Sequence, residues 1–166
     1  MNNKFVVIDL ETSGLSKSDY IIEVGAVKIE NGKLTERFSS FVSCPQQLSP
    51  ETTYLTGITN DQLIGEPSVE EVLKKLHSFS KGCILVAHNM SFQYSFLSKY
   101  GEEYGIFFDN PMIDTLTIAK ARLNGRVKNY HLGTIAEYLC IETGNLYHSI
   151  DYAILAAKMF LELEKM

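Results

Sequence analysis

The chain has 166 residues, of which 45% are hydrophobic and 21% are charged, which is typical of one folded domain (residues 1–166) and excludes a disordered segment. No apolar run reaches the roughly 18 residues of a membrane span, and Met1-Asn2-Asn3-Lys4 does not resemble a signal peptide, so we expect a cytoplasmic protein. The net charge of −5 argues against non-specific duplex binding, and Cys44, Cys83 and Cys140, which lack C-x-x-C spacing, are expected to be reduced structural thiols.

The first third of the chain predicts three strands, over residues 5–11, 20–29 and 34–42. The first is a continuous apolar run and therefore a buried strand. Asn31-Gly32 is a strong signal for a hairpin between the second and the third strand. The three strands should form an antiparallel meander that Pro45 and Pro50 end, followed by a loop that contains residues 54–59.

Beyond the meander, helices and strands are expected to alternate. Ser68 and Glu71 form an S-x-x-E capping box and predict a helix that Gly82 ends. Further strands are predicted at 83–87 and 112–114, and further helices from about Ser91, near 115–123, near 131–139 and from about 147 to 165. This order predicts an α/β fold of ribonuclease-H-like type, with a mixed five-stranded sheet of three antiparallel strands and then parallel additions, flanked by helices.

The first predicted strand ends with two carboxylates, Asp9 and Glu11. Because side chains alternate faces along a strand, both point the same way and lie close together. Adjacent anions repel each other and are costly to desolvate unless a divalent cation lies between them, and hard oxygen ligands suit Mg²⁺ or Mn²⁺. Gly14 then turns the chain and leaves the pair accessible to a substrate. An ordinary solvated strand end is the alternative interpretation.

Positive charge is concentrated in one window of the sequence. No acidic residue occurs from Thr115 to Ala136, whereas the window contains Lys120, Arg122, Arg126 and Lys128. It is either a solvated helix end and loop or a basic lip beside an acidic metal pocket, and composition does not choose between the two.

Several segments together resemble one family, the DEDD-type 3′–5′ exonucleases, and within it the epsilon proofreading domains of bacterial replicative polymerases. The similar segments are Ile8–Leu15, Ile21–Val27, Leu55–Thr59, Val86–Phe92, Pro111–Leu116 and Leu132–Ala136. They occur in the family's order over nearly the whole chain. The resemblance implies a proofreading exonuclease of DNA replication, a hydrolase that acts on nucleic acid.

The resemblance also implies a site in which four carboxylates hold two divalent ions about 4 Å apart, with a His or Tyr that handles the attacking water. It makes Asp9 and Glu11 metal ligands and implies nucleotide binding by Thr12, Gly14, Leu15, Leu55, Thr56, Asn89 and Phe92. The second motif departs from the family, which has a carboxylate where this chain has Gln93. A neutral amide cannot replace a bridging anion at equal affinity.

Two alignments of the third motif remain open. Without gaps, the family's His falls on Tyr147 and its final Asp on Tyr152, so both functional groups are missing. Alternatively, Tyr147 and Asp151 form a Tyr-x-x-x-Asp pair on one helical face, which adds Asp151 as a catalytic metal ligand. Helical periodicity favours the gapless alignment, because Asp151 falls in a polar stripe and Tyr152 lies at the edge of the apolar face. His148 is either a substitute base or a surface histidine.

Two further acidic residues have structural interpretations. Asp114 matches a family position, but its Ile-Asp-Thr context predicts a strand-to-helix cap. Glu23 is expected on the strand beside Asp9, where a glutamate is more often paired structurally.

Three hypotheses for function follow. The first is a degenerate exonuclease domain that engages single-stranded 3′ ends, of DNA rather than RNA, with weak or lost hydrolysis and at most one weakly held Mg²⁺ or Mn²⁺. The second is a non-catalytic interaction module of a DNA polymerase or repair complex. The third is an active nuclease that uses Asp9, Glu11 and Asp151 with Tyr147.

Overall fold

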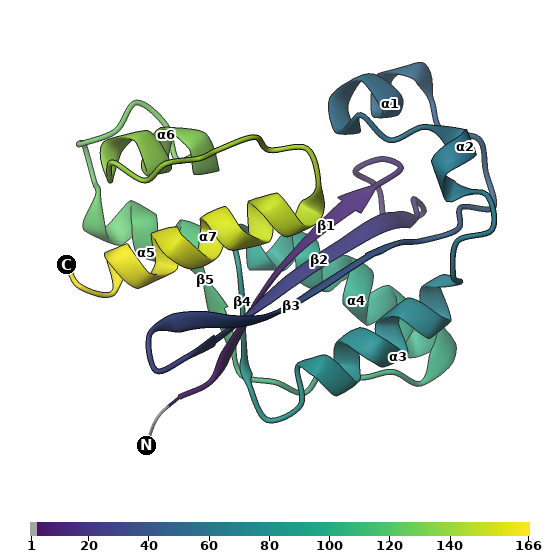
Figure 1. Ribbon diagram of the computed structural model, residues 1–166, viewed down its shortest axis with the longest axis horizontal. Coiled ribbons are helices and arrows are strands. Elements are labelled where there is room, and N and C mark those ends of the chain that lie inside the picture. Colours follow the sequence, from purple (N-terminus) through teal and green to yellow (C-terminus); the bar gives the residue numbers. More distant parts are fainter. Residues whose placement is uncertain (1–2) are drawn as a thin grey trace.

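A computed structural model of the chain describes residues 3–166 and contains one mixed sheet in the order β3-β2-β1-β4-β5. The strands β1 (Phe5–Thr12), β2 (Ile21–Glu30) and β3 (Lys33–Phe41) form the antiparallel meander. The strands β4 (Ile84–Ala87) and β5 (Met112–Asp114) are parallel to β1 (Figure 1). The predicted α/β fold with a five-stranded mixed sheet is confirmed.

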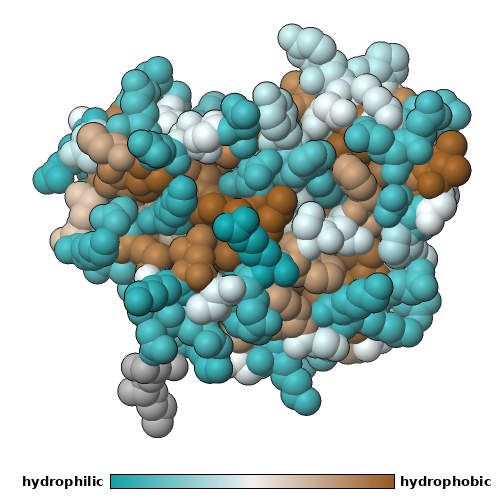
Figure 2. Space-filling view, in the orientation of Figure 1, coloured by the Kyte–Doolittle hydropathy of each residue, from teal (hydrophilic) through white to brown (hydrophobic). Residues whose placement is uncertain are grey.

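Helices cover both faces of this sheet because β1 and β2 bury side chains on both sides. Val6, Ile8 and Leu10 enter one core, which the helices α3 (Val69–Phe79) and α4 (Met90–Tyr104) complete. Val7 enters the other core and packs against α7 (Ser149–Leu163). The helices α5 (Thr115–Arg122) and α6 (Leu132–Tyr138) pack beside α7 (Figure 1). Hydrophilic side chains cover much of the face seen in Figure 2, with hydrophobic surface exposed between them.

The expected loop around residues 54–59 is partly helical, so that prediction was wrong. Helix α1 (Pro50–Thr56) begins after Ser49, whose Oγ accepts a hydrogen bond from the backbone nitrogen of Thr52 at 3.0 Å. Pro50 at the first helical position and Gly57 in a left-handed conformation at the end complete the helix signal, so Pro50 begins a helix as well as following the meander. The short helix α2 (Asn60–Leu63) follows, and both lie at the end of the sheet where β1 ends (Figure 1).

Other boundaries differ from the predictions by a few residues. The capping box of Ser68 and Glu71 is confirmed, but α3 ends at Phe79 and not at Gly82. Helix α7 begins at Ser149, so Tyr147 precedes it. Within residues 3–166, no helix combines the length and the apolar character needed to cross a membrane.

Candidate functional site

Three carboxylates lie together on the sheet face that α7 covers. Asp9 and Glu11 are two residues apart on β1, and Glu23 of β2 lies directly opposite Glu11 in the strand register. By alternation along the strands, all three share the face of Val7 and Val27, which pack against α7.

Gly25 allows the beginning of α7 to lie on the sheet beside these carboxylates. It is opposite Asp9 in the register, and a Cβ atom at this position would overlap the backbone of Ser149 and Ile150. The buried Glu23 accepts a hydrogen bond at Oε2 from the nitrogen of Ser149 at 2.9 Å, so the positive end of the helix compensates its charge. Sequence reasoning missed Gly25, although a glycine inside a buried strand signals a close backbone approach.

Gln93, in the first turn of α4, is the polar partner of Asp9. Its Nε2 donates a hydrogen bond to Oδ1 of Asp9 at 3.3 Å, and the residue is only 4% exposed. Its Oε1 is buried and has no hydrogen-bond partner in the part of the chain that the structure describes. The second-motif position therefore lies beside Asp9, but it presents an amide where the family has a carboxylate.

The pKa values of the carboxylates reflect this crowding. Burial raises the pKa of Asp9 well above its usual range, and the charges of Glu11 and Glu23 raise it further, against the opposing hydrogen bond from Gln93. Burial, and then the charge of Glu23, raise the pKa of Glu11 to about 7. These shifts arise because anions share a poorly solvated surface without a compensating cation.

The residues of the third motif have different surroundings at the beginning of α7. Tyr152 lies close enough to the carboxylates that its pKa is raised by burial first and then by the charges of Glu11 and Asp9. Asp151 caps the helix, since its Oδ2 accepts hydrogen bonds from the nitrogens of Tyr147 at 3.2 Å and His148 at 3.0 Å. Tyr147 is 66% exposed and lies before the helix, so the expectation that it shares a helical face with Asp151 was wrong.

His148, directly before α7, contacts one residue of β2 and one residue of β3. Its Nδ1 lies 2.9 Å from Oε1 of Glu23, and its ring packs edge-on against Phe41 with 5.7 Å between the ring centroids. Oε2 of Glu23 is thus hydrogen-bonded to the first turn of α7, whereas Oε1 lies within ion-pair distance of the imidazole without hydrogen-bond geometry. The expectation that Glu23 is structurally paired agrees with these contacts.

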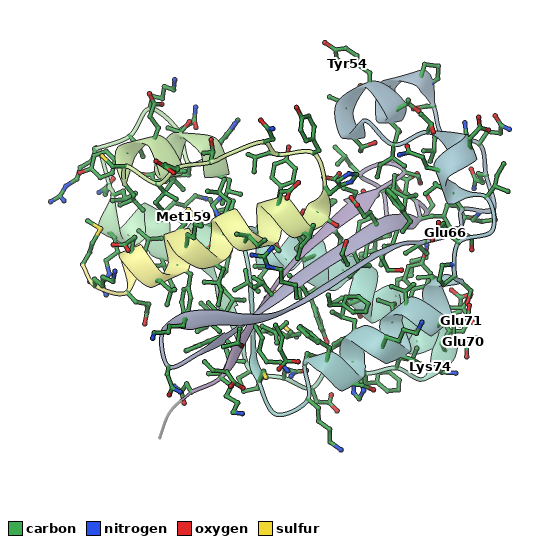
Figure 3. The ribbon with its side chains drawn as sticks, viewed as in Figure 1. Tyr54, Glu66, Glu70, Glu71, Lys74 and Met159 are labelled. Carbon is green, nitrogen blue, oxygen red and sulfur yellow. The ribbon has the colours of Figure 1, made fainter. Side chains whose placement is uncertain are left out.

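Two cavities meet at Glu11. The first, of about 430 Å³, lies between the turn after β1, helix α1 and the beginning of α4, and its lining includes Thr12, Gly14, Leu15, Leu55, Thr56 and Phe92. The second, of about 420 Å³, lies between α1 and the beginning of α7, and its lining includes Tyr54, Tyr147, His148 and Tyr152. Glu11, Leu55 and Thr56 line both. Tyr54 projects outward from α1 at the rim (Figure 3).

Of the residues expected to bind a nucleotide, only Asn89 is outside the first cavity. Asn89 adopts a left-handed conformation before α4, and its backbone nitrogen donates to Oδ1 of Asp114 at 3.0 Å. The same oxygen accepts from the nitrogens of Met90 at 3.3 Å and Leu116 at 3.0 Å. Asp114 is thus the cap that its sequence context predicts, and it also fastens the beginning of α4 to that of α5.

The turn between β1 and β2 forms a wall of the first cavity and is fastened to α4. The Asp19 side chain packs against Gly14, where a Cβ atom would overlap its carboxylate. Nζ of Lys99 donates to the backbone oxygen of Asp19 at 2.8 Å and lies over the rings of Tyr20 and Tyr100. Sequence reasoning missed this contact, because it joins segments 80 residues apart.

Comparison with known proteins assigns the chain to a family. The model of the Exonuclease family, RNase_T, matches residues 6–160. The chain belongs to this exonuclease family. It is 39% identical over its whole length to a DNA polymerase III PolC-type protein of Caldanaerobacter subterraneus subsp. tengcongensis, of which it spans 12%. It is 37% identical to the DNA polymerase III subunit epsilon of Aquifex aeolicus, over 98% of this chain and 81% of that protein.

The exonuclease fold extends to more distant structures. E. coli exonuclease I in complex with a dA16 oligonucleotide matches 98% of this chain and 41% of its own, with a TM-score of 0.84 at 15% identity, which is a likeness of fold alone. The resemblance to the DEDD superfamily and the epsilon proofreading domains is confirmed by these comparisons.

The residues of this exonuclease domain do not fit a two-ion centre. Nucleases of that type hold two divalent ions about 3.5–4 Å apart between several carboxylates. Here, no group of three or more His, Cys, Asp or Glu side chains suited to a metal ion occurs within the described range 3–166. At the positions expected to supply the other two carboxylates, this chain has the amide of Gln93 and the phenol of Tyr152.

Proposed function

We propose that this exonuclease-family domain binds the 3′ end of single-stranded nucleic acid, DNA in preference to RNA, and that its metal-dependent hydrolysis is weak or lost. The observation that carries the proposal is the contact of Gln93 with Asp9, because it puts a neutral amide where a two-ion site needs an anion. Loss of one such electrostatic stabiliser costs about 10²–10³-fold in rate.

The two cavities support binding of a strand end. Each is large enough for part of a nucleotide, and both border Glu11, so a terminal phosphodiester between them would lie beside the carboxylates. Leu55 is 72% exposed and lines both cavities, which suits a side chain that separates two bases. Phe92 offers a ring for stacking in the first cavity. The names of the DNA polymerase III relatives favour DNA.

The donor set suits one divalent ion better than two. We propose that Asp9 and Glu11, with the unpartnered Oε1 of Gln93, hold a single Mg²⁺ or Mn²⁺ weakly. Such an ion, when bound, neutralises the carboxylate pair and supplies Lewis-acid polarisation of a phosphate. For residual hydrolysis, His148 is the better candidate base than Tyr147, because its Nδ1 lies 2.9 Å from Oε1 of Glu23 and its ring borders the cavity of Glu11. Asp151 is a weaker ligand candidate because its carboxylate caps α7.

A paired measurement of binding and hydrolysis tests this proposal. We expect a fluorescent oligonucleotide with a free 3′ end to bind in the presence of EDTA, more tightly than one that carries a 3′-phosphate. Leu55→Ala should weaken this binding. Any release of mononucleotides with Mn²⁺ should be slow and should disappear in Asp9→Ala. Absence of oligonucleotide binding, or hydrolysis by the wild type as fast as by a complete four-carboxylate relative, would contradict the proposal.

Restoring the missing anions gives a second and more discriminating test of the proposal. Gln93→Asp with Tyr152→Asp should bind two Mn²⁺ ions in calorimetric titration, where the wild type binds one or none, and should release mononucleotides faster. Gln46→Asp with Tyr138→Asp adds the same charge at exposed positions of the surface and serves as the matched control. Two bound ions in the wild-type protein would refute the account of a degenerate site.

A second candidate function is docking on a DNA polymerase or repair protein without catalysis. Two of the most exposed large apolar side chains, Tyr54 and Ile64 at 87% and 76%, lie on or beside α1 and α2, and the PolC-type relatives are much longer polymerases. A purified PolC-type polymerase lacking its exonuclease segment should then bind this domain with an affinity that Asp9→Ala leaves unchanged and Ile64→Asp reduces. No binding at micromolar concentration would remove this candidate.

A further inference from the structure

The acid-free window of the sequence carries four exposed basic side chains, although the chain as a whole has a net charge of −5. Lys120 and Arg122 lie in the last turn of α5, and Arg126 and Lys128 lie in the connection to α6. We call these four residues the basic strip. All four side chains are exposed, and none takes part in the ion pairs found among residues 3–166.

The connection between α5 and α6 contacts, near its end, the residue that follows β4. His88, directly after β4, contacts the backbone oxygen of Tyr130 through Nε2 at 2.9 Å and Oγ1 of Thr115 through Nδ1 at 3.0 Å. Burial lowers the pKa of His88, and the nearby charge of Lys120 contributes to this. Since β4 is the neighbour of β1, the contact with His88 ties Tyr130, two residues after Lys128, to the sheet beside the strand that carries Asp9 and Glu11.

A structural role accounts for only two of the four charges of the basic strip. Lys120 and Arg122 complement the negative end of the α5 dipole, so these two charges have a structural use. Arg126 and Lys128 lie beyond the helix and have no such use. In Figure 1 the connection between α5 and α6 runs along the flank of the molecule opposite α1 and α2.

We infer that the basic strip binds the phosphate backbone of single-stranded DNA whose 3′ end occupies the cavities beside Glu11. The inference rests on the proposed function. Among the residues that the structure describes, the linings of the two cavities contain Glu11 and neither a lysine nor an arginine, so they offer no cation to the phosphates. A strand held at its end there needs cations elsewhere for its phosphates, and the strip supplies them beyond the cavities, on the flank that Tyr130 ties to His88 (Figure 1). A strand of one or two nucleotides fits within the cavities and should not reach the strip.

Length and salt dependence separate the strip from the cavities. Each phosphate contact to a single strand adds about 0.7 to the slope of log affinity against log salt concentration. Replacement of all four basic residues by Gln should therefore lower the slope for a twelve-nucleotide strand by up to about 3 and its affinity by roughly 10- to 100-fold. The affinity for a dinucleotide should not change.

A matched variant controls for total charge. Lys33, Arg37, Lys75 and Lys81 are also exposed, and their replacement by Gln changes the net charge equally. Lys75 belongs to α3, which lies across the sheet from the strip and whose outer surface Figure 3 marks with Glu70 and Lys74. Binding of twelve-nucleotide oligo-dT and of a dinucleotide should be measured in EDTA, by anisotropy and calorimetry respectively. The control should weaken the longer strand by less than about threefold.

The outcomes distinguish the two proposals. If the wild type binds neither probe, the proposed function fails. If it binds both probes and the strip variant is no weaker than the control on the longer strand, the strip inference fails while the proposed function stands. Because Lys120 and Arg122 also stabilise α5, the double variant Arg126→Gln with Lys128→Gln should be tested too. It should lose about half of the salt slope with no change in the unfolding midpoint.

Discussion

Glu11 is an ionisable group without a hydrogen-bond or ion-pair partner within residues 3–166, and burial and Glu23 raise its pKa to about 7 from 4.5. Between these two values the folded protein holds a proton that the unfolded chain releases. Glu11 therefore destabilises the metal-free fold progressively as the pH rises from about 4.5 through 7.

Removal of this charge should stabilise the protein at high pH only. Glu11→Gln is expected to raise the free energy of unfolding by about 1–3 kcal/mol at pH 8 and to change it little at pH 5. Urea unfolding in EDTA at both pH values measures this difference. Glu51→Gln, at an exposed position in the lining of the same cavity, is the control and should change stability by less than about 0.5 kcal/mol. Equal effects of Glu11→Gln at the two pH values would contradict the assignment.

Asp114 is a second residue whose contacts predict a large effect. Its Oδ1 serves three backbone nitrogens, so Asp114→Ala should cost about 2–3 kcal/mol of stability. Asp114→Asn keeps an acceptor and should cost less than half of that. Thermal unfolding of both variants, with Asp109→Ala at an exposed position as the control, checks the order. A loss no larger than that of Asp109→Ala would show that water replaces the carboxylate.

At the scale of elements, the docking of α7 on β2 depends on the absence of one side chain. Gly25→Ala would place a Cβ atom inside the backbone of Ser149 and Ile150, so the helix has to move away from the carboxylates. We expect a loss of about 1–3 kcal/mol in the free energy of unfolding. Weaker oligonucleotide binding should accompany it, because Tyr152 and His148 move with α7. Gly133→Ala in α6 is the matched control: nothing lies within 4 Å of a Cβ there, and helix propensity predicts a gain of about 0.5–1 kcal/mol.

The sequence predicted most elements because their patterns are local. Amphipathic periodicity located α3 and α7, and the buried runs located β1 and β4. Helix α1 was not predicted because it has few apolar residues. The residues that mark its ends are Ser49, Pro50 and Gly57. The predicted beginning of α7, at about residue 147, lies two residues before the observed one. The side chain of Asp151 caps the helix at His148, so the helix does not extend back to Tyr147.

At the scale of the whole molecule, the same reasoning found only part of the site. Asp9 and Glu11 were predictable together because they are two residues apart on one strand. The position of Gln93 beside them was expected from the family resemblance, and that of Tyr152 from one of two alignments, which helical periodicity favoured. The contacts of His148 with Glu23 and of Lys99 with Asp19 depend on how distant elements pack, which no local pattern contains.

A restored metal site should link metal binding to folding. Gln93→Asp with Tyr152→Asp adds two anions beside Asp9 and Glu11, so the metal-free variant should be less stable than the wild type. Each bound Mn²⁺ should return about 2.7 kcal/mol at 100 times its dissociation constant. Differential scanning fluorimetry across a Mn²⁺ titration measures the shift, and Gln46→Asp with Tyr138→Asp should show none. A variant whose midpoint ignores Mn²⁺ would exclude a restored site.

Helix α4 contacts two segments that are far apart in sequence. Its first turn carries Gln93, which donates to Asp9, and its later turns carry Lys99, which donates to the backbone oxygen of Asp19. The Asp19 side chain in turn packs against Gly14 in the lining of the first cavity. A tilt of α4 that separates Gln93 from Asp9 should therefore also displace the turn that carries Gly14, so the carboxylates and the cavity wall are mechanically coupled through one helix.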